Sequence, residues 1–494
     1  MWYLYVILVY FLVLTGLNFF RARKIKTQED FMVAGRSLNI RVMVFTLICT
    51  WIGSGTFIAG AEYAARAGFS SLWMPAGAWV GIIVIYFLAS KIRTFGQYTV
   101  GDILEVRYGK FARLFGALAL IISFTAIVSY QFRAGGYILN VITEGKITVP
   151  QGQFWTAVFV ILFTALGGMV AVAYTDLPNG IIILIATIAA VPFVIHAAGG
   201  LSSALITLPP EHFTVINETF GTHPMLKAGS YFLATMLLLL GVQTMYQKFY
   251  SAKTPKDAKV AVSLWVVGTI IVETVVVVIA VFAASRYWPE INAWLVNHKT
   301  GIDPASIVLV AAKKMVPPIV GLLLMGAASV VVLSTGMNYL LSPTTNIMRD
   351  IYQRFLRREA SQREMVALQR IMVLILGVIA WLLAVKMESV LNTAYFAYTI
   401  YGASITPALI AALAWKRATR AGGLWSIILG SVTAIALKVF SGLYPQLSPE
   451  GDPFGIPIIY PAFLISILAL IIISYMTKPP SKEEIASLFP DEKK

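Results

Sequence analysis

The sequence predicts an all-α polytopic membrane protein with about 13 transmembrane helices. Hydrophobic residues make up 58% of its 494 residues, charged residues make up only 12%, and the mean hydropathy is +0.79. A soluble globular protein of this length does not reach so apolar a composition. Apolar runs long enough to span a bilayer recur near residues 2–20, 40–65, 70–91, 113–141, 152–173, 176–198, 229–249, 259–284, 317–342, 365–386, 390–414, 421–443 and 457–477.

The distribution of basic residues predicts an N-terminus outside the cell and a C-terminus in the cytoplasm. The first apolar run lacks a basic leading segment and a small-residue cleavage site, so we expect a retained helix. Arg21, Arg23, Lys24 and Lys26 follow this run, which places the next loop in the cytoplasm by the positive-inside rule. After thirteen crossings, the loops on that side hold 28 of the 38 Lys and Arg residues. The net charge of +15 therefore reflects membrane topology, and no basic domain for nucleic acid is predicted.

The second apolar run contains the segment WIGSGTFIAG (51–60), in which glycines interrupt a membrane helix. Glycine is a poor residue for a helix interior, and an unwound turn in the bilayer persists only inside protein or beside a cavity. Gly53, Ser54 and Gly55 therefore predict a break that frees carbonyl oxygens for an ion and a solute near the midplane. The alternative is close helix packing through small residues.

The ninth run contains VLSTGMNYLLSP (332–343), with two adjacent hydroxyl residues, Ser334 and Thr335. Sodium is a hard cation that is bound by carbonyl and hydroxyl oxygens. These two hydroxyls, together with carbonyls from the broken helix, would form a site without any carboxylate. The alternative is that both hydroxyls bond to carbonyls of their own helix.

Three ionisable residues lie within predicted spans and are therefore candidates for function. They are Glu62, Arg133 and Glu273. Glu62 and Arg133 are expected to pair with each other, or Arg133 extends toward the outer surface. The functional alternative is that Arg133 attracts a substrate carboxylate.

The chain resembles the sodium/solute symporter family, which includes sodium-coupled proline, pantothenate, galactose and sialic acid transporters. The resemblance covers nearly the whole chain and rests on the joint order and spacing of several blocks. These are DFMVAGRSLN (30–39), SGTFIAGAEYAARAG (54–68), QYTVGDILEVRYG (97–109), GGMVAVAYTD (167–176), YQKFYSAKTPKDAK (246–259), NIMRDIYQRF (346–355) and AWKRATRAG (414–422).

The resemblance implies two inverted five-helix repeats whose first helices are broken, the LeuT-like core, with flanking helices. Gly241 is the expected break in the first helix of the second repeat. The implied organisation is a first helix and cytoplasmic loop (1–39), a first repeat (40–198), an outer loop (199–228), a second repeat (229–414), two C-terminal helices (415–477) and a cytoplasmic tail (478–494).

The resemblance also implies a sodium site. Its ligands fall on the carbonyls of Thr50, Gly53 and Val331 and on the hydroxyls of Ser334 and Thr335.

Some members of the family bind a second sodium ion. Asp176 matches the aspartate of that site, but Met337 and Asn338 stand where hydroxyl ligands would be, which argues against a second ion. Asp176 is then expected to assist ion release or to cap a helix.

The substrate-contacting position on the fourth span of relatives aligns with Gln131 rather than Arg133. Other candidates for the wall of the substrate site are Thr56, Phe57, Trp73 and Gln243, with packing as the alternative role for the two aromatic residues. Phe57 replaces a polar residue of the sugar transporters, which argues against a sugar.

These observations together predict sodium-coupled symport of a small organic solute, an amino acid or a small carboxylate, by alternating access. Proton coupling on the same fold and a transporter-like solute sensor are the alternatives. No metalloprotease or nucleophile-elbow motif is present, so we expect no enzyme activity. Na⁺ is the only expected cofactor, no obligate protein partner is predicted, and the expected location is the inner or plasma membrane of a bacterium or archaeon.

Overall fold

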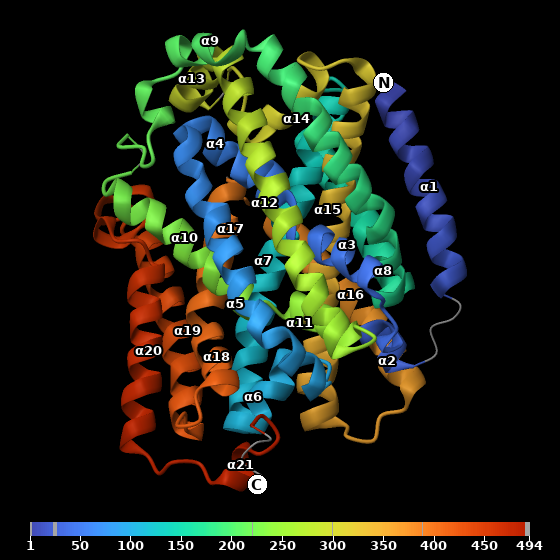
Figure 1. Ribbon diagram of the computed structural model, residues 1–494, viewed down its shortest axis with the longest axis vertical. Helices are drawn as coiled ribbons and strands as arrows, with labels where there is room; N and C mark the ends of the chain where they lie inside the picture. Colours follow the sequence, from blue (N-terminus) through green and yellow to red (C-terminus); the bar gives the residue numbers. More distant parts are fainter. Residues whose placement is uncertain (1, 23–26, 220, 299, 388, 490–494) are drawn as a thin grey trace.

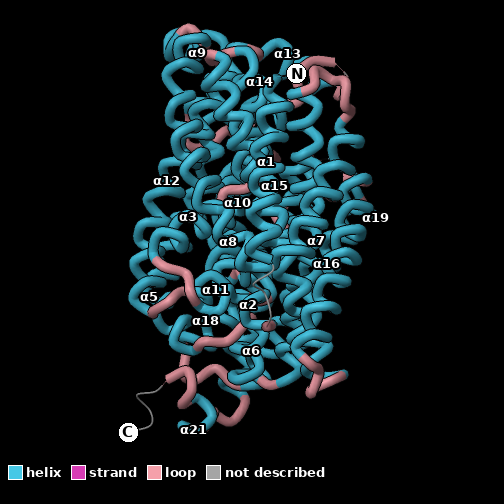
Figure 2. Tube along the Cα trace, turned by 90° about the vertical axis from the view of Figure 1, so that its right-hand side faces the viewer, coloured by secondary structure: helices cyan, strands magenta, loops and turns pink. Residues whose placement is uncertain are grey.

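The computed structural model describes residues 2–22, 27–219, 221–298, 300–387 and 389–489 of the chain. They form one elongated helical bundle with its connections at the two ends (Figures 1 and 2). Within these residues β-structure is limited to a single isolated bridge, between Leu38 and Ala252. The predicted all-α class is confirmed.

The bundle is built from helices of very different length. The longer helices are α1 (Trp2–Ala22), α3 (Ile40–Trp51), α5 (Trp73–Phe95), α7 (Lys110–Ile142), α8 (Val149–Ala197), α10 (Pro224–Gly241), α12 (Pro255–Arg286), α15 (Pro318–Asn346), α16 (Gln362–Val385), α17 (Val390–Ser404), α19 (Arg420–Leu443) and α20 (Ile459–Met476). The shorter helices are α2 (Gln28–Val33), α4 (Ala61–Ala67), α6 (Val100–Tyr108), α9 (Gly200–Thr207), α11 (Gln243–Ser251), α13 (Trp288–Asn297), α14 (Ile307–Lys314), α18 (Thr406–Ala414) and α21 (Lys482–Ile485). Two π-helices, η2 (Gly55–Gly60) and η6 (Ile347–Leu356), continue α3 and α15. Short 3₁₀ turns complete the set: η1 (Ala34–Arg36), η3 (Gly68–Leu72), η4 (Pro210–Phe213), η5 (Pro304–Ser306), η7 (Pro445–Leu447), η8 (Pro449–Gly451) and η9 (Pro453–Gly455).

The described residues contain 11 helical segments that are long and apolar enough to cross a membrane. Two shorter apolar helices, Trp2–Leu14 and Ile40–Trp51, correspond to the first predicted span and to the first half of the second. Together they account for the thirteen predicted crossings. The helix α1 begins at the end of the bundle that carries α9 and α13, and α21 lies at the opposite end beside α6 (Figure 1).

The long helix α8 contains two of these crossings. Segments 149–166 and 173–197 each qualify as a span. The ring of Phe159 lies 5.4 Å from that of Phe11, and Asn179 accepts a hydrogen bond of 2.6 Å from the neighbouring Tyr10. A straight helix would separate residues 159 and 179 by about 30 Å. The chain must therefore turn back between the two segments, as the two adjacent predicted spans require.

Two helices of the bundle are broken at equivalent points. The helix α3 ends at Ile52, with φ −68° and ψ 104°, before the chain continues into η2 and α4. The helix α10 ends at Val242, with φ −62° and ψ 117°, before α11. The matching backbone angles support the predicted inverted repeats with broken first helices. The bridge between Leu38 and Ala252 also joins the start of the first broken helix to the end of the second.

Side chains satisfy the carbonyl groups that the second break releases. The Tyr401 hydroxyl donates to the Gly241 carbonyl at 2.6 Å, and the Tyr246 hydroxyl donates to the Leu240 carbonyl at 3.0 Å. A Cβ atom at Gly241 would lie 2.3 Å from Oγ1 of Thr406. Glycine at this position therefore lets α17 and α18 approach the break closely.

Burial separates central helices from peripheral ones. Within the span Val390–Ala414, a stretch of 18 apolar residues is 89% buried inside the structure, whereas the 18 residues of Ile459–Met476 are only 28% buried. The C-terminal tail also packs against the bundle, since Nζ of Lys91 lies 3.8 Å from the centroid of the Phe489 ring. Residues 490–494 of the predicted tail lie outside the described residues.

Tyr401→Phe is expected to lower the free energy of unfolding by about 1–3 kcal/mol, because it leaves the buried Gly241 carbonyl without a donor. Unfolding of the purified protein in mixed detergent micelles measures this difference. Tyr475→Phe is the matched control, because this tyrosine is 65% exposed and its removal should change stability little. Equal effects of the two substitutions would contradict the role given to Tyr401.

Candidate sodium and solute site

The first break presents two carbonyl oxygens to one hydroxyl of α15. Oγ1 of Thr335 lies 3.0 Å from the Cys49 carbonyl oxygen and 3.1 Å from the Ile52 carbonyl oxygen, and donates to them. All three groups are buried. A side chain on α15 thus binds backbone that the break has released on α3.

The glycines of the break permit close approach on two sides. A Cβ atom at Gly53 would lie 2.8 Å from Cγ2 of Thr335, and one at Gly55 would lie 2.5 Å from the Tyr398 hydroxyl. Neither contact is compatible with a larger residue unless the neighbour moves. Both explanations of this segment, a break and close packing, therefore apply, because the break is formed where other helices contact the backbone.

Asp176 connects α3 and α15 beside the break. Its carboxylate accepts a hydrogen bond from Ser334 and another, of 2.5 Å, from Oγ1 of Thr46. The Asp176 side chain is fully buried and lies within α8. Its oxygens bond to other helices, which differs from the expected alternative of a helix cap.

A buried lysine occupies the space beside Asn338. Nζ of Lys248 donates to Oδ1 of Asn338 at 2.6 Å and lies 3.1 Å from Sδ of Met169. Nδ2 of Asn338 in turn donates to the Ser334 carbonyl at 3.0 Å. The positive charge of Lys248 also acts on Asp176. Both ends of the Asn338 amide thus have hydrogen-bond partners within the protein.

A small cavity lies on the other side of the break. Its volume is about 30 Å³, which is room for about two water molecules. The carboxylate of Glu273 on α12 faces it and accepts hydrogen bonds from Nε1 of Trp51 at 3.0 Å, Nε1 of Trp79 at 2.7 Å and Oγ1 of Thr56 at 3.5 Å. The lining includes Trp51, Gly55, Thr56, Met74, Glu273 and Tyr398.

Two of the predicted substrate residues lie at the helix break, and one of the two also lines the cavity. Thr56 lines the cavity. Oε1 of Gln131 accepts a hydrogen bond of 3.2 Å from the Ser54 backbone N–H, and Nε2 of Gln131 is buried without a hydrogen-bond partner in the structure. A buried donor without a partner is costly, so the two N–H bonds of the Gln131 amide are candidates for contact with a solute.

The other predicted substrate residues lie elsewhere. Trp73 donates to the Val215 carbonyl at 2.9 Å, outside the cavity. Arg133 lies 5.7 Å from the centroid of the Tyr137 ring. Phe57, like the predicted sodium ligand Val331, is fully buried and is not part of the cavity wall.

Glu62 does not pair with Arg133 as the first alternative for these residues predicted. Glu62 lies 3.7 Å from Arg66 on its own helix instead. This spacing is the ordinary one between residues four apart on a helix. Glu273 could be recognised from the sequence as an ionisable residue in a span, but no sequence signal pointed to Trp79.

Gln243 belongs to a polar cluster at the α6 end of the bundle. Oε1 of Gln243 accepts from the Val100 backbone N–H at 3.1 Å, and its Nε2 donates to Oγ of Ser342 at 3.0 Å. Nδ2 of Asn346 connects this group to Oδ2 of Asp350 at 2.6 Å. The amide of Gln243 is thus fully used in joining the second broken helix to α6 and α15.

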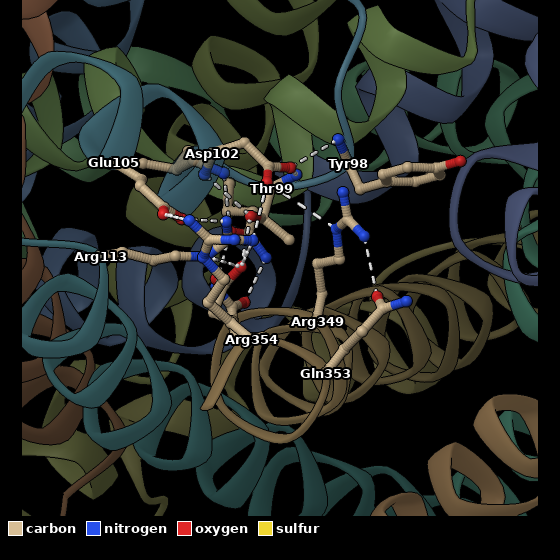
Figure 3. A network of polar contacts seen from close by, with 12 residues as sticks. Tyr98, Thr99, Asp102, Glu105, Arg113, Arg349, Gln353 and Arg354 are labelled. Carbon is tan, nitrogen blue, oxygen red and sulfur yellow. Dashed lines mark hydrogen bonds and ion pairs between the residues drawn. The ribbon is translucent and has the colours of Figure 1, made fainter. Parts of the chain in front are cut away.

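Arg113 is the centre of the charged part of this cluster (Figure 3). It forms ion pairs of 2.7 Å with Asp102, 2.6 Å with Glu105 and 2.5 Å with Asp350. Only 6% of the Arg113 side chain is exposed. Arg354 also pairs with Glu105. The cluster connects α6, α7 and η6 across this end of the bundle.

Known proteins of similar sequence are membrane transporters. The osmoregulated proline transporter OpuE of Bacillus subtilis (strain 168) is 27% identical over 96% of this chain and 94% of its own length. The high-affinity choline transporter 1 of Homo sapiens is 26% identical over 91% of this chain and 79% of its own length.

Solved structures share the fold. A Na⁺-coupled sialic acid symporter superposes with a TM-score of 0.79 at 16% identity, covering 97% of this chain and 99% of its own. Mhp1, a nucleobase-cation-symport-1 family transporter, superposes with a TM-score of 0.58 at 13% identity, covering 93% of this chain and 98% of its own. The profile of the sodium:solute symporter family matches residues 31–430, most of the chain. This integral membrane protein belongs to the sodium:solute symporter family, and it is a sodium-coupled symporter of a small solute rather than an enzyme.

Proposed function

We propose that this chain transports a small amino acid of the proline type together with sodium bound at the first helix break. The observation that carries the proposal is the contact of the Thr335 hydroxyl with two carbonyl oxygens of the broken helix, 3.0 and 3.1 Å away. Hydroxyl and carbonyl oxygens suit a hard monovalent cation. When the hydroxyl hydrogen turns away, the lone pairs of the same oxygens face one point.

The sodium ligands in this proposal come from two helices. The segment from Cys49 to Gly53 supplies carbonyl oxygens, among which those of Thr50 and Gly53 are the sequence-based choice. The hydroxyls of Ser334 and Thr335 and the carbonyl of Val331 complete the set from α15. Asp176, bonded to Ser334, supplies negative charge beside the ion and a first acceptor when the ion leaves.

Coupling follows from the proposed position of the ion between the α3 break and α15. Sodium that joins the α3 break to α15 fixes the shape of the adjacent segment, where Thr56 and Gln131 are available for the solute. Each ligand then raises the affinity for the other by the same factor. One charge moving down about 100 mV supplies about 2.3 kcal/mol, which supports accumulation of the solute on the order of 50-fold.

The proposed solute class comes from the transported solutes named for similar proteins. Two transporters of Bacillus subtilis (strain 168), 27% identical to this chain, carry proline.

In the proposed transport cycle the two repeats comprise residues 40–198 and 229–414. Rocking of one set of helices against the other exposes the site to each side of the membrane in turn.

The ionic cluster around Arg113 is proposed as the closed gate on the cytoplasmic side. It holds α6, α7 and η6 together through buried ion pairs. A path to the cytoplasm at this end requires those helices to separate, so the ion pairs must break during each transport cycle.

Thr335→Val is expected to raise the sodium concentration for half-maximal uptake by roughly 10-fold or more. The substitution removes the contact of the hydroxyl oxygen with the sodium ion, and a polar contact to a charged group contributes about 1.5–3 kcal/mol. Uptake of labelled L-proline into proteoliposomes with an inward sodium gradient measures this concentration. Thr344→Val is the matched control, since the Thr344 hydroxyl bonds only to the Leu341 carbonyl of its own helix, at 2.7 Å.

An unchanged sodium dependence in Thr335→Val would contradict the proposed sodium site. Uptake that follows a proton gradient equally well in potassium would contradict sodium coupling itself and favour the proton-coupled alternative.

Arg113→Ala is expected to lower the free energy of unfolding by about 3–5 kcal/mol, because it leaves buried carboxylates without their counter-charge. Arg357→Ala removes an ion pair whose arginine is 63% exposed and should cost less than about 1 kcal/mol. Unfolding in mixed micelles compares the two variants. Similar losses would show that the cluster is no stronger than a surface pair.

Labelling of single cysteines tests the proposed topology. In a Cys49→Ser background, Val296→Cys on α13 should react with a membrane-impermeant maleimide on intact cells, whereas Leu356→Cys in η6 should react only after permeabilisation. The two positions are comparably exposed, at 78% and 74%. The reverse pattern would place the N-terminus in the cytoplasm.

A further inference from the structure

We propose that Glu273 binds the positively charged nitrogen of the transported solute, so that the substrate class is ammonium-bearing molecules rather than simple carboxylates. This inference rests on the proposed transport function and adds the group that selects the solute. It depends on the position of one carboxylate, on the character of its hydrogen-bond partners and on the cavity that it faces.

Glu273 is deeply placed and lacks a counter-charge. It is 5% exposed and lies near the middle of the span Pro255–Arg286. Among the described residues, no Lys, Arg or His side chain forms an ion pair with it. The other buried carboxylates differ in this respect, since Asp350 pairs with Arg113 and Asp176 has Lys248 nearby. A buried acidic group in a membrane span without a counter-charge is expected to have a function.

All the hydrogen-bond partners of Glu273 act as donors. Trp51 and Trp79 each donate an indole N–H, at 3.0 and 2.7 Å, to different carboxylate oxygens. An indole nitrogen has no lone pair with which to accept a proton from a carboxylic acid. Thr56, at 3.5 Å, contacts the same oxygen as Trp51. The indole contacts stabilise negative charge on the carboxylate, which lines the cavity.

The cavity places this charge beside the proposed sodium site. Its wall combines Glu273 and Thr56 with the aromatic side chains of Trp51 and Tyr398. Aromatic faces attract cations in addition to the carboxylate. Trp51 is also the last residue of α3, and the Cys49 and Ile52 carbonyls that bind Thr335 lie within two residues of it. A cationic solute group at Glu273 therefore contacts the same turn that sodium would fix.

The size of the cavity shows that binding requires movement. Its volume of about 30 Å³ is room for about two water molecules, which is less than any amino acid requires. The Tyr398 hydroxyl stands over Gly55 and lies 3.2 Å from the Tyr130 hydroxyl. Displacement of Tyr398 is the simplest way to enlarge the space beside Glu273, because its hydroxyl contacts the glycine of the break.

Matched pairs of solutes with and without a cationic nitrogen test the inference on the purified full chain. Thermal stabilisation in sodium is measured with L-proline and with tetrahydrofuran-2-carboxylate, which keeps the carboxylate but has oxygen in place of the charged ring nitrogen. Choline and its neutral isostere 3,3-dimethylbutan-1-ol form a second pair, which carries no carboxylate, and the common amino acids extend the panel. We expect stabilisation by ammonium-bearing members and none by the counterparts that lack the cationic nitrogen.

Glu273→Gln is expected to weaken binding of the stabilising solute by about 30-fold or more, because it removes one partner of a buried charge pair. The melting temperature without solute shows that the variant is folded. Glu62→Gln is the matched control, because it makes the same chemical change at another buried carboxylate, which is bonded to Ser389 and Arg66 outside the cavity. This control should bind the solute with wild-type affinity.

The inference is overturned if Glu273→Gln binds the solute as tightly as the wild type. It is also overturned if the wild-type protein binds the isosteres without a cationic nitrogen more tightly, or if no ammonium-bearing solute stabilises it. The comparison of sodium with potassium in wild-type protein tests the proposed symport separately, because Glu273 is unchanged in it. If solutes stabilise the protein equally in sodium and in potassium, the proposed symport is wrong. If solutes without a cationic nitrogen stabilise it best, and only in sodium, only the role of Glu273 is wrong.

Discussion

Backbone carbonyl groups released inside a membrane must find partners within the protein, and this requirement governs the centre of the bundle. In the hydrocarbon region no water is available to bond to them. Both broken helices meet the requirement with side-chain hydroxyls. Thr335 of α15 serves the first break, and Tyr401 of α17 serves the second together with Tyr246 from the α11 half of the broken helix itself. The breaks therefore form only when the helices that carry those hydroxyls are packed in place.

The two breaks differ in what can replace the hydroxyl. At the second break, large tyrosine side chains bind single carbonyls, and this arrangement suits a permanent contact. At the first break, one small threonine hydroxyl lies between two carbonyls, with Ser334 and Asp176 close by. A cation can take over the role of that hydroxyl hydrogen. The difference in side-chain size and in the number of converging oxygens explains why an ion site is proposed at one break only.

Three of the buried carboxylate sites among the described residues are compensated in three different ways. Around Arg113 the charges neutralise one another and hold helices together. At Asp176 the negative charge is shared among hydroxyls and a nearby lysine. At Glu273 only neutral donors are present among the described residues. Because uncompensated charge is expensive in a membrane, the third arrangement depends on a visiting ligand in a way that the first two do not.

The sequence by itself determined the all-α membrane class, the succession of apolar spans and the weakness at Gly53–Gly55, and it offered Ser334 and Thr335 as candidate ligands, because hydropathy, glycine placement and adjacent hydroxyls are local properties of the chain. Only the tertiary structure decided which groups meet. It bonded Gln243 into a polar cluster and Trp73 to the Val215 carbonyl, and it brought Trp79 to Glu273 across 194 residues of sequence. The direction in which a side chain points around a helix, and the neighbour it reaches, depend on how the helices pack, and no single segment of the sequence contains that information.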